Sequence, residues 1–444
     1  MSFVTNTRSL TQYRNIIFSL LYKGGALLAS LLMVPLSLSF LSESAYGTWL
    51  VIYSVLSWTT FFDFGLGNGL KNKLSEALAL DDAPRAVRLV STHYVILLLV
   101  VTIGIGIFSA AQPFINWHRL LNVDKQQVHL KTLIWICLTI FGLKLVLDSI
   151  HSVLLAFQKA AIVQLNGFLA SLLSLAVVFG LSHMEVEAPL RLPLLGILVT
   201  MAPALLSLGF NIYFFSGELR TVRPSLRQFH PGYIRDLFSL GGQFFVIQIA
   251  ALVIYSTDNI LISRLFSPKH VTVYNVAYKL FSTFNIAWNL IIAPYWVAFG
   301  EAYVKRDYAW IKKAMTTLLY FWALMNACLL LCLHFSDQLY RLWVGQEVRV
   351  PADLSASMAL FVSIAAFSNI FAYFVNGLGK IRVQLIVSTF SAAINIPLAI
   401  LLSKTLGLKG IVLATCICLA ISATAVCLQY FRVINQKAKG VWNR

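Results

Sequence analysis

Apolar residues dominate the chain in runs of about 20 residues, the length that an α-helix needs to cross the hydrocarbon core of a bilayer. Short polar segments separate these runs. The pattern predicts twelve membrane-spanning helices, at residues 15–41, 45–64, 89–111, 131–157, 160–183, 190–215, 237–265, 271–299, 314–334, 355–378, 382–403 and 409–431. We therefore expect an all-α polytopic membrane protein.

Lys and Arg are unevenly distributed over the segments that join the predicted spans. With the N-terminus inside, the inner segments hold roughly twice as many of these residues as the outer ones. Cytoplasmic loops carry an excess of Lys and Arg, so the bias predicts that both termini are cytoplasmic.

The longest inner segment is basic and lies in the middle of the chain. It predicts a six-helix N-terminal lobe at 1–217, a basic cytoplasmic linker at 218–236 and a six-helix C-terminal lobe at 237–444. Six spans in each half give both halves the same orientation. Two such lobes around a central cavity are the architecture of a transporter.

A weak internal repeat supports two lobes. The matched positions are Gly24-Gly25 with Gly241-Gly242, Tyr46 with Tyr274, and Asp81 with Asp307. Otherwise the two halves share little sequence.

Composition agrees with a membrane protein. The chain is 59% hydrophobic and 11% charged, whereas soluble domains carry about 25% charged residues. The net charge of +17 is spread over short loops, which argues against nucleic-acid binding. All six cysteines lie in apolar runs without the spacing of metal ligands, so we expect no metal site.

Ionisable residues inside the predicted spans need an explanation, because a charge in the hydrocarbon core is costly. The candidate cations are Lys23, Lys144, Lys279 and Arg264, the candidate acids are Asp148 and Asp258, and the other polar candidates are His151, Asn259, Asn285 and Asn289. The cations slightly outnumber the acids, which favours an anionic substrate in a water-filled lumen. His93, His183 and His334 lie near span ends, where we expect them at the membrane interface.

One helical face carries Lys144, Asp148 and His151, which are spaced by four and three residues. Two interpretations stay open for this face. Lys144 and Asp148 can form a self-neutralising pair that joins helices, or they can line the lumen. Arg264, near an outer span end, can extend its side chain to the interface instead.

The string at 61–77, FFDFGLGNGLKNKLSEA, ends the second predicted span. Its distinctive positions are Asp63, Gly65, Gly67, Asn68 and Gly69. Glycines permit a positive φ or a close backbone approach, so the string predicts a helix break at the membrane exit.

Residues 62–77 resemble the signature that follows the second span of Wzx-type oligosaccharide flippases. These are polysaccharide transporters of the MOP superfamily, which also contains the MATE exporters. Further stretches agree in order, at 241–266, 273–282, 293–313 and 376–385.

The resemblance implies that an undecaprenyl-diphosphate-linked oligosaccharide moves from the cytoplasmic to the periplasmic face of the bacterial inner membrane by alternating access, for O-antigen or capsule assembly. Basic lumen residues would hold the diphosphate, and membrane lipid would surround the prenyl chain. Asp148 or Asp258 would bind a coupling proton or sodium ion, and no other cofactor is expected. Other membrane proteins of polysaccharide assembly are candidate partners.

Two alternatives stay open. A MATE-like exporter of cationic drugs has the same fold but favours an acid-rich lumen. A membrane enzyme that uses lipid-linked sugars would be expected to present a sizeable outer loop with catalytic residues, whereas the predicted outer loops are short. We therefore expect a transporter rather than an enzyme.

Overall fold

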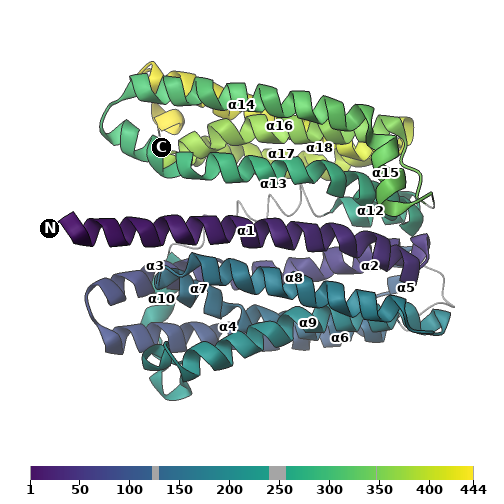
Figure 1. The fold of residues 1–444 in the computed structure, drawn as a ribbon, viewed down its shortest axis with the longest axis horizontal. Coiled ribbons are helices and arrows are strands. Elements are labelled where there is room, and N and C mark those ends of the chain that lie inside the picture. Colours follow the sequence, from purple (N-terminus) through teal and green to yellow (C-terminus); the bar gives the residue numbers. More distant parts are fainter. Residues whose placement is uncertain (1, 123–129, 240–256, 347, 444) are drawn as a thin grey trace. The chain divides into compact units, whose positions relative to one another are not determined.

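The computed structural model describes residues 2–122, 130–239, 257–346 and 348–443, and every regular element within these ranges is a helix. The chain divides into two compact units, Met1–Phe245 (unit 1) and Val246–Arg444 (unit 2). The all-α fold predicted from the sequence is confirmed (Figure 1).

Unit 1 is a bundle of long helices with short helical turns at their ends (Figure 1). Its α-helices are α1 (Ser2–Phe40), α2 (Glu43–Ser57), α3 (Leu66–Ala79), α4 (Ala83–Ala111), α5 (Trp117–Leu121), α6 (Leu130–Leu147), α7 (Ser149–Ala156), α8 (Ala160–Ser182), α9 (Ala188–Ser216) and α10 (Gly232–Ser239). Its 3₁₀ turns are η1 (Trp58–Asp63), η2 (Gln112–Phe114), η3 (Arg220–Val222) and η4 (Leu226–Gln228). The segment around η3, η4 and α10 packs on α3 and α4.

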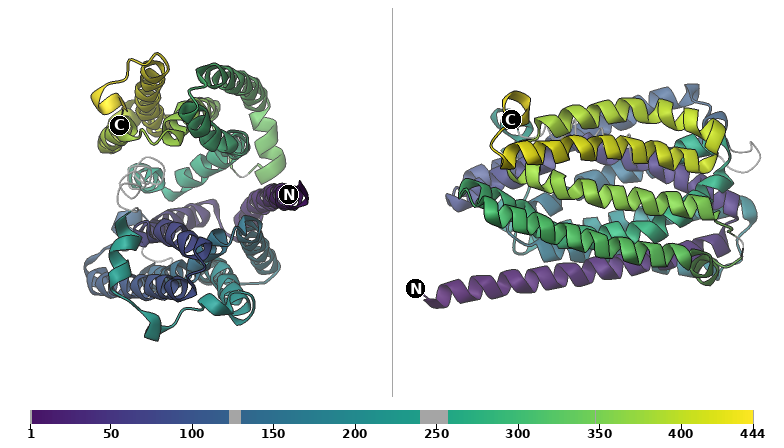
Figure 2. Two further views of the ribbon diagram at one scale, coloured as in Figure 1. Left: turned by 90° about the vertical axis from the view of Figure 1, so that its left-hand side faces the viewer. Right: turned by 90° about the horizontal axis from the view of Figure 1, so that it is seen from above.

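Unit 2 is likewise a bundle whose long helices lie side by side (Figure 2). Its elements are α12 (Asp258–Leu265), α13 (Pro268–Val304), α14 (Tyr308–His334), α15 (Ser336–Val344), α16 (Ala352–Gly377), α17 (Arg382–Leu406), α18 (Leu408–Ile434) and the 3₁₀ turn η5 (Gly440–Asn443).

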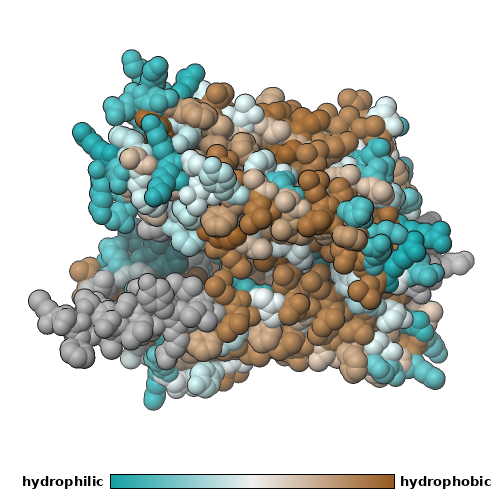
Figure 3. Space-filling view, turned by 45° about the horizontal axis from the view of Figure 1, so that its top comes forward, coloured by the Kyte–Doolittle hydropathy of each residue, from teal (hydrophilic) through white to brown (hydrophobic). Residues whose placement is uncertain are grey.

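Ten helical segments of the described ranges are long and apolar enough to cross a membrane, and each overlaps a predicted span. The predicted span 45–64 corresponds to the shorter α2 and its continuation η1. Most of the predicted span 237–265 lies outside the described residues, and α12 forms its last part. Hydrophobic side chains cover the middle of the visible face, with hydrophilic ones at its two ends (Figure 3), as spanning helices require.

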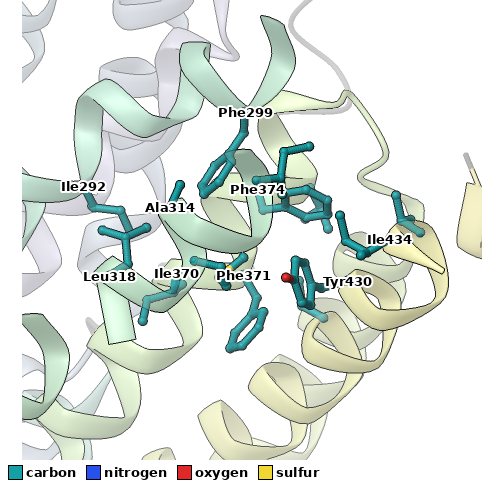
Figure 4. Close-up of a cluster of buried hydrophobic side chains, with 14 of the residues drawn as sticks. Ile292, Phe299, Ala314, Leu318, Ile370, Phe371, Phe374, Tyr430 and Ile434 are labelled. Atoms are coloured by element: carbon teal, nitrogen blue, oxygen red, sulfur yellow. The ribbon is translucent and has the colours of Figure 1, made fainter. Parts of the chain in front are cut away.

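Aromatic rings fill the core of unit 2 (Figure 4). Phe299 of α13 lies edge-on to Phe374 of α16, at 5.5 Å between ring centroids, and Phe374 contacts Tyr430 of α18 at 5.1 Å. Trp288 is buried in the same core. Lipid tails are as apolar as these side chains, so close packing holds the helices together.

Two glycines let α13 and α16 cross at close range. A Cβ atom on Gly300 would lie 2.6 Å from the carbonyl oxygen of Gly377, and one on Gly377 would lie 2.3 Å from that of Trp296. Small residues are typical of such crossings between membrane helices. Both glycines belong to stretches that carry the sequence resemblance, so these stretches have a structural role.

The two units share a turn geometry. Asp82 N donates to Ala77 O in unit 1, Asp307 N donates to Ala302 O in unit 2, and both bonds are 2.9 Å long. Each aspartate then caps the next helix with its carboxylate. The equivalent of Asp307 is therefore Asp82, and the predicted match with Asp81 was one residue off. The sequences of the two units are too dissimilar to align these turns, whereas the main-chain and capping bonds pair Asp82 with Asp307.

We predict that Gly377→Ala destabilises the protein by about 1–3 kcal/mol, because the added methyl group cannot fit against the α13 backbone. The unfolding midpoint in detergent, followed by tryptophan fluorescence, measures this. Gly104→Ala is the control, since a Cβ atom there meets open space. Equal midpoints for the two variants would contradict the predicted crossing.

Candidate functional site

The glycine-rich string at 61–77 forms a capped break between η1 and α3. Phe64 and Gly65 follow η1 with φ of 48° and 78°, and α3 begins directly after them. The Asp63 carboxylate accepts the backbone N–H of Gly67, with 3.0 Å from the nitrogen to each oxygen. The break predicted from the glycines is present, and Asp63 supplies a partner for the freed N–H group.

Two glycines of this string bring other elements close to α3. A Cβ atom on Gly67 would lie 2.9 Å from Ser152 Oγ of α7, and one on Gly69 would lie 2.1 Å from the carbonyl oxygen of Leu237 in α10. Asn68 is exposed. These two glycines therefore allow close packing of α7 and α10 on α3, and Asn68 lies on the exposed side of α3.

A charged cluster follows on α3 and α4. Glu76 pairs with Lys73 at 3.0 Å and with Arg85 at 3.1 Å. Hydrogen bonds from Lys73 and Arg85 lower the pKa of the Glu76 carboxyl. The two basic side chains thus favour the ionised form of the Glu76 carboxyl.

A polar network crosses unit 1 where one predicted span is interrupted at Asp148, between α6 and α7. The Lys144 ammonium pairs with the Asp148 carboxylate. The side chain of Lys144 is 28% exposed, and that of Asp148 is 24% exposed. Ser207 of α9 donates to the other carboxylate oxygen at 2.7 Å. The pair therefore joins the start of α7 to α9 through Ser207, and part of it is exposed. Its place in a lumen stays a prediction.

Two further side chains complete this network. Asn211 of α9 donates to the carbonyl oxygen of Leu147 at 2.7 Å, at the interruption itself. Tyr94 of α4 donates to Asn211 Oδ1 at 2.8 Å. One side chain, Asn211, thus satisfies a backbone carbonyl at the interruption, as an apolar environment demands, and Tyr94 holds that amide in place.

His93 lies in this region, inside the helix bundle, and its position at the membrane interface stays a prediction. Its side chain is fully buried, and Nε2 lies 2.9 Å from Ser149 Oγ at the start of α7. The sequence places His93 near a span end, but the helix interruption supplies a polar partner there. His151, one turn further along α7, is half-buried, and its Nε2 has no hydrogen-bond partner among the described residues.

Unit 2 holds a second polar cluster, around Asp258 at the start of α12. Its side chain is 4% exposed, and Tyr274 of α13 donates to Oδ2 at 2.6 Å. Within the described ranges Oδ1 is buried without a hydrogen-bond partner. Beside it, Asn275 donates to Asn259 Oδ1 at 2.7 Å.

A small cavity of about 10 Å³ adjoins this carboxylate. Its lining includes Asp258, Tyr274, Tyr278 and Thr415. That volume is close to the minimum for one water molecule. The oxygens around it can therefore hold one proton or one small cation.

The candidate cations have different surroundings. Lys279 of α13 is half-buried, and no partner of its ammonium lies among the described residues. Arg264, in the last turn of α12, and Lys23 of α1 are exposed. Beside Lys23, a Cβ atom on Gly25 would lie 2.4 Å from the ring of Phe168 in α8, so α1 and α8 approach closely there.

The two asparagines predicted on α13 lie one turn apart. Asn289 Nδ2 donates to the carbonyl oxygen of Asn285 at 2.8 Å, and Tyr373 of α16 donates to Asn289 Oδ1 at 3.4 Å. Asn289 is exposed, and Asn285 is half-buried. They form a polar stretch along α13 beyond Lys279.

The structure thus brings Lys144 together with Asp148, and Asp258 next to Asn259. Ser207, Asn211, Tyr94 and Tyr274 were missed because uncharged side chains in apolar runs give no distinct signal. The pairing of an acid with a hydroxyl group depends on which helices are neighbours.

Two family models match the chain. One, described as "Polysaccharide biosynthesis protein", matches residues 13–297, more than half of the chain. The other, described as "MatE", matches residues 244–401. The resemblance predicted from the sequence is confirmed.

Two relatives align with most of the chain. The "Putative O-antigen transporter" of Salmonella typhimurium is 21% identical over 392 residues, which cover 87% of this chain and 88% of that protein. The "Putative O-antigen export protein" of Yersinia pseudotuberculosis is 22% identical over 398 residues, which cover 85% and 86%.

Solved structures of MATE transporters share the fold. An inward-facing multidrug resistance MATE transporter of the MOP superfamily has a TM-score of 0.74 at 16% identity, with 94% of this chain and 95% of that chain covered. An outward-facing one has a TM-score of 0.64 at 18% identity, with 96% of each chain covered.

We predict that Asp148→Leu destabilises the protein by about 1–3 kcal/mol, because Lys144 and Ser207 lose their acceptor. The double variant Lys144→Met/Asp148→Leu should lose less than the sum of the single variants. Unfolding midpoints of the four proteins measure this coupling. The exposed pair Glu301–Lys305 has the same spacing and is the control, with an expected coupling of about 0.5 kcal/mol or less. Equal coupling in both pairs would contradict the assigned network.

Proposed function

The chain belongs to the polysaccharide biosynthesis protein family, and we propose that it is a flippase for a lipid-linked oligosaccharide. In this proposal an undecaprenyl-diphosphate-linked repeat unit of O-antigen or capsule moves from the cytoplasmic to the periplasmic face of the inner membrane. Both termini are cytoplasmic, and the two units alternate access to the substrate. The observation that carries the proposal is the family match over more than half of the chain.

The names of the aligned relatives support the substrate class, because each names O-antigen transport or export. These relatives are transporters by name, and the chain likewise acts as a transporter rather than an enzyme. Proteins that assemble the polysaccharide are the expected partners on either face of the membrane.

Lys279 is the cation to which we assign the diphosphate. A diphosphate carries charges that Lys and Arg recognise through charge-assisted hydrogen bonds. Lys144 already has Asp148 as a partner, so its charge is largely compensated. Lys279 has no described acid beside it and is half-buried, which strengthens its attraction for an anion.

The remaining parts of the substrate have different needs. Asn285, Asn289 and Tyr373 present amide and hydroxyl groups along α13 and α16, which suit the hydroxyl groups of sugars. The prenyl chain stays in lipid. Lys23 and Arg264 are exposed cations that provide secondary contacts with the anionic group.

Directed transport needs an energy source, and we assign the coupling ion to Asp258. Its buried carboxylate, the Tyr274 hydroxyl and the adjoining cavity of about 10 Å³ fit one proton or one sodium ion. Asp148 is less suitable, because Lys144 and Ser207 already occupy its oxygens.

A second candidate function is a cation-coupled multidrug exporter of the MATE type. The MatE match at 244–401 and the buried acid at Asp258 favour it. Likeness to MATE structures at 16–18% identity concerns the fold alone. Efflux of a cationic dye, without transport of lipid-linked sugar, would support this alternative over the flippase.

We predict that Lys279→Gln lowers transport at least about tenfold, because one charge-assisted contact with the diphosphate is lost. Uptake of radiolabelled undecaprenyl-diphosphate-linked sugar into inside-out membrane vesicles measures this. Lys279→Arg should retain most of the uptake, and Lys404→Gln, an exposed lysine of α17, should retain all of it. Full uptake by normally expressed Lys279→Gln protein would remove this residue from the site.

We predict that Asp258→Asn makes uptake independent of the ion gradient, because the neutral amide cannot take up and release the coupling ion. Uptake by the variant should equal that of the unmodified protein treated with a proton or sodium ionophore. Tyr274→Phe, which removes only the hydroxyl donor, should reduce the response partially. If uptake by the unmodified protein ignores both ionophores, the coupling role of Asp258 is wrong.

A further inference from the structure

A pocket of about 510 Å³ lies at the end of unit 2 where α13, α16 and α18 finish and α17 begins. Its size is typical of small-ligand sites, which span about 300–1,000 Å³. The polar side chains in its lining are Tyr303, Arg306, Tyr308, Lys380, Gln436 and Asn443. No Asp or Glu is among the described residues that line it.

The walls of the pocket are held in place. Tyr303 and Tyr308 pack against the aromatic core of unit 2, the cluster drawn in Figure 4. The fully buried Gln429 donates from Nε2 to the carbonyl oxygens of Lys380, at 3.0 Å, and of Trp442 in η5, at 3.1 Å. The Arg432 guanidinium lies 4.2 Å from the Trp442 ring centroid. A buried amide thus joins η5 to the loop that carries Lys380.

Lys380 is charged and has neutral partners. Its ammonium donates to the Tyr303 hydroxyl at 2.5 Å and to Asn443 Oδ1 at 2.7 Å. It follows the C-terminal end of α16, where the helix dipole stabilises a cation. An ammonium has three donors, so one of them remains for a ligand in the pocket.

Unit 1 contains the same turn with a different charge balance. The turn before Lys159 is closed by a 2.9 Å bond from Lys159 N to Leu154 O, and the turn before Lys380 is closed by a 3.0 Å bond from Lys380 N to Val375 O. Lys159 is neutralised by an ion pair with Glu218. Lys380 has no such carboxylate among its described partners.

Gln436 of unit 2 and Glu218 of unit 1 both lie one residue before a main-chain bond that closes a helix end, although only Gln436 has a positive φ, of 56°. Glu218 precedes the 2.8 Å bond from Leu219 N to Phe214 O, and Gln436 precedes the 2.8 Å bond from Lys437 N to Arg432 O. By the capped turns described above, Arg306 stands where unit 1 has Asp81. The pocket of unit 2 thus carries an amide and a guanidinium at turns where unit 1 has carboxylates, and it is cationic.

We propose that this pocket binds a phosphate-bearing anion, with Lys380 and Arg306 as its cationic contacts. Guanidinium and ammonium groups are the usual phosphate partners, and Tyr303 and Asn443 hold the ammonium in position. In the orientation predicted from the loop charges, this end of unit 2 faces the cytoplasm. The phosphate belongs to an anionic lipid head group or to a free phosphate compound. This binding is independent of the transported substrate.

The test uses the purified full chain in neutral detergent. Native mass spectrometry counts bound phosphatidylglycerol, with phosphatidylcholine as the neutral comparison, and the unfolding midpoint is measured with each lipid and with inorganic phosphate. The variant is Gln436→Glu, which places a carboxylate in the lining of the pocket and keeps every cation. Gln228→Glu, at an exposed position of η4, is the matched control.

We expect the unmodified protein and Gln228→Glu to bind phosphatidylglycerol, and Gln436→Glu to bind it at least about tenfold more weakly, because the new carboxylate pairs with Lys380. Stabilisation by phosphatidylglycerol alone identifies a lipid head group, and stabilisation by inorganic phosphate that competes with the lipid identifies a free phosphate. Arg306→Gln repeats the test with one cation removed. The proposal is overturned if both variants bind like the unmodified protein, or if neither probe binds better than phosphatidylcholine.

Discussion

Unpaired backbone groups are the main constraint on this structure. A free N–H or C=O group in hydrocarbon is so unfavourable that a spanning helix must be continuous, or side chains must satisfy the groups that a break exposes. Two helix breaks in unit 1 are satisfied in this way. Asp63 accepts the N–H of Gly67 after η1, and Asn211 donates to Leu147 O between α6 and α7.

Polar chemistry follows from these repairs. Asp148 stands at the break between α6 and α7, and its carboxylate, Lys144 and Ser207 extend the repair into a network of charged and neutral groups. In unit 2, the buried carboxylate of Asp258 at the start of α12 accepts a hydrogen bond from the Tyr274 hydroxyl. Polar side chains that a membrane helix would otherwise exclude are thus available where a transporter needs to handle ions and polar substrates.

Much of the fold was predictable because hydrocarbon imposes a simple length rule. The apolar runs located ten spans within a few residues, and Gly65 and Gly67 marked the break correctly. The span at 45–64 is less regular than predicted, because α2 ends at Ser57 and tightens into a 3₁₀ turn. Periodicity does not distinguish these two helix types.

The site was less predictable, because the role of each charged side chain depends on the residues that lie next to it in the fold. The spacing of Lys144 and Asp148 predicted their contact, because both lie on one helix. The partners of His93, Asp258 and Lys380 come from other helices or distant loops. A single sequence contains no direct information on which of those helices are adjacent, so these partners required the structure.

The repeated turns carry a consequence for how such a protein diverges. In both units the backbone of the turn is closed by main-chain bonds, as at Asp82 and Asp307. The side chains next to the closing bond do not form it. A carboxylate at such a turn can therefore be exchanged for a basic side chain, as at Asp81 and Arg306, while the backbone of the turn stays the same. At the ends of the two units, the charges of the side chains can therefore diverge while the backbone turns keep the same geometry.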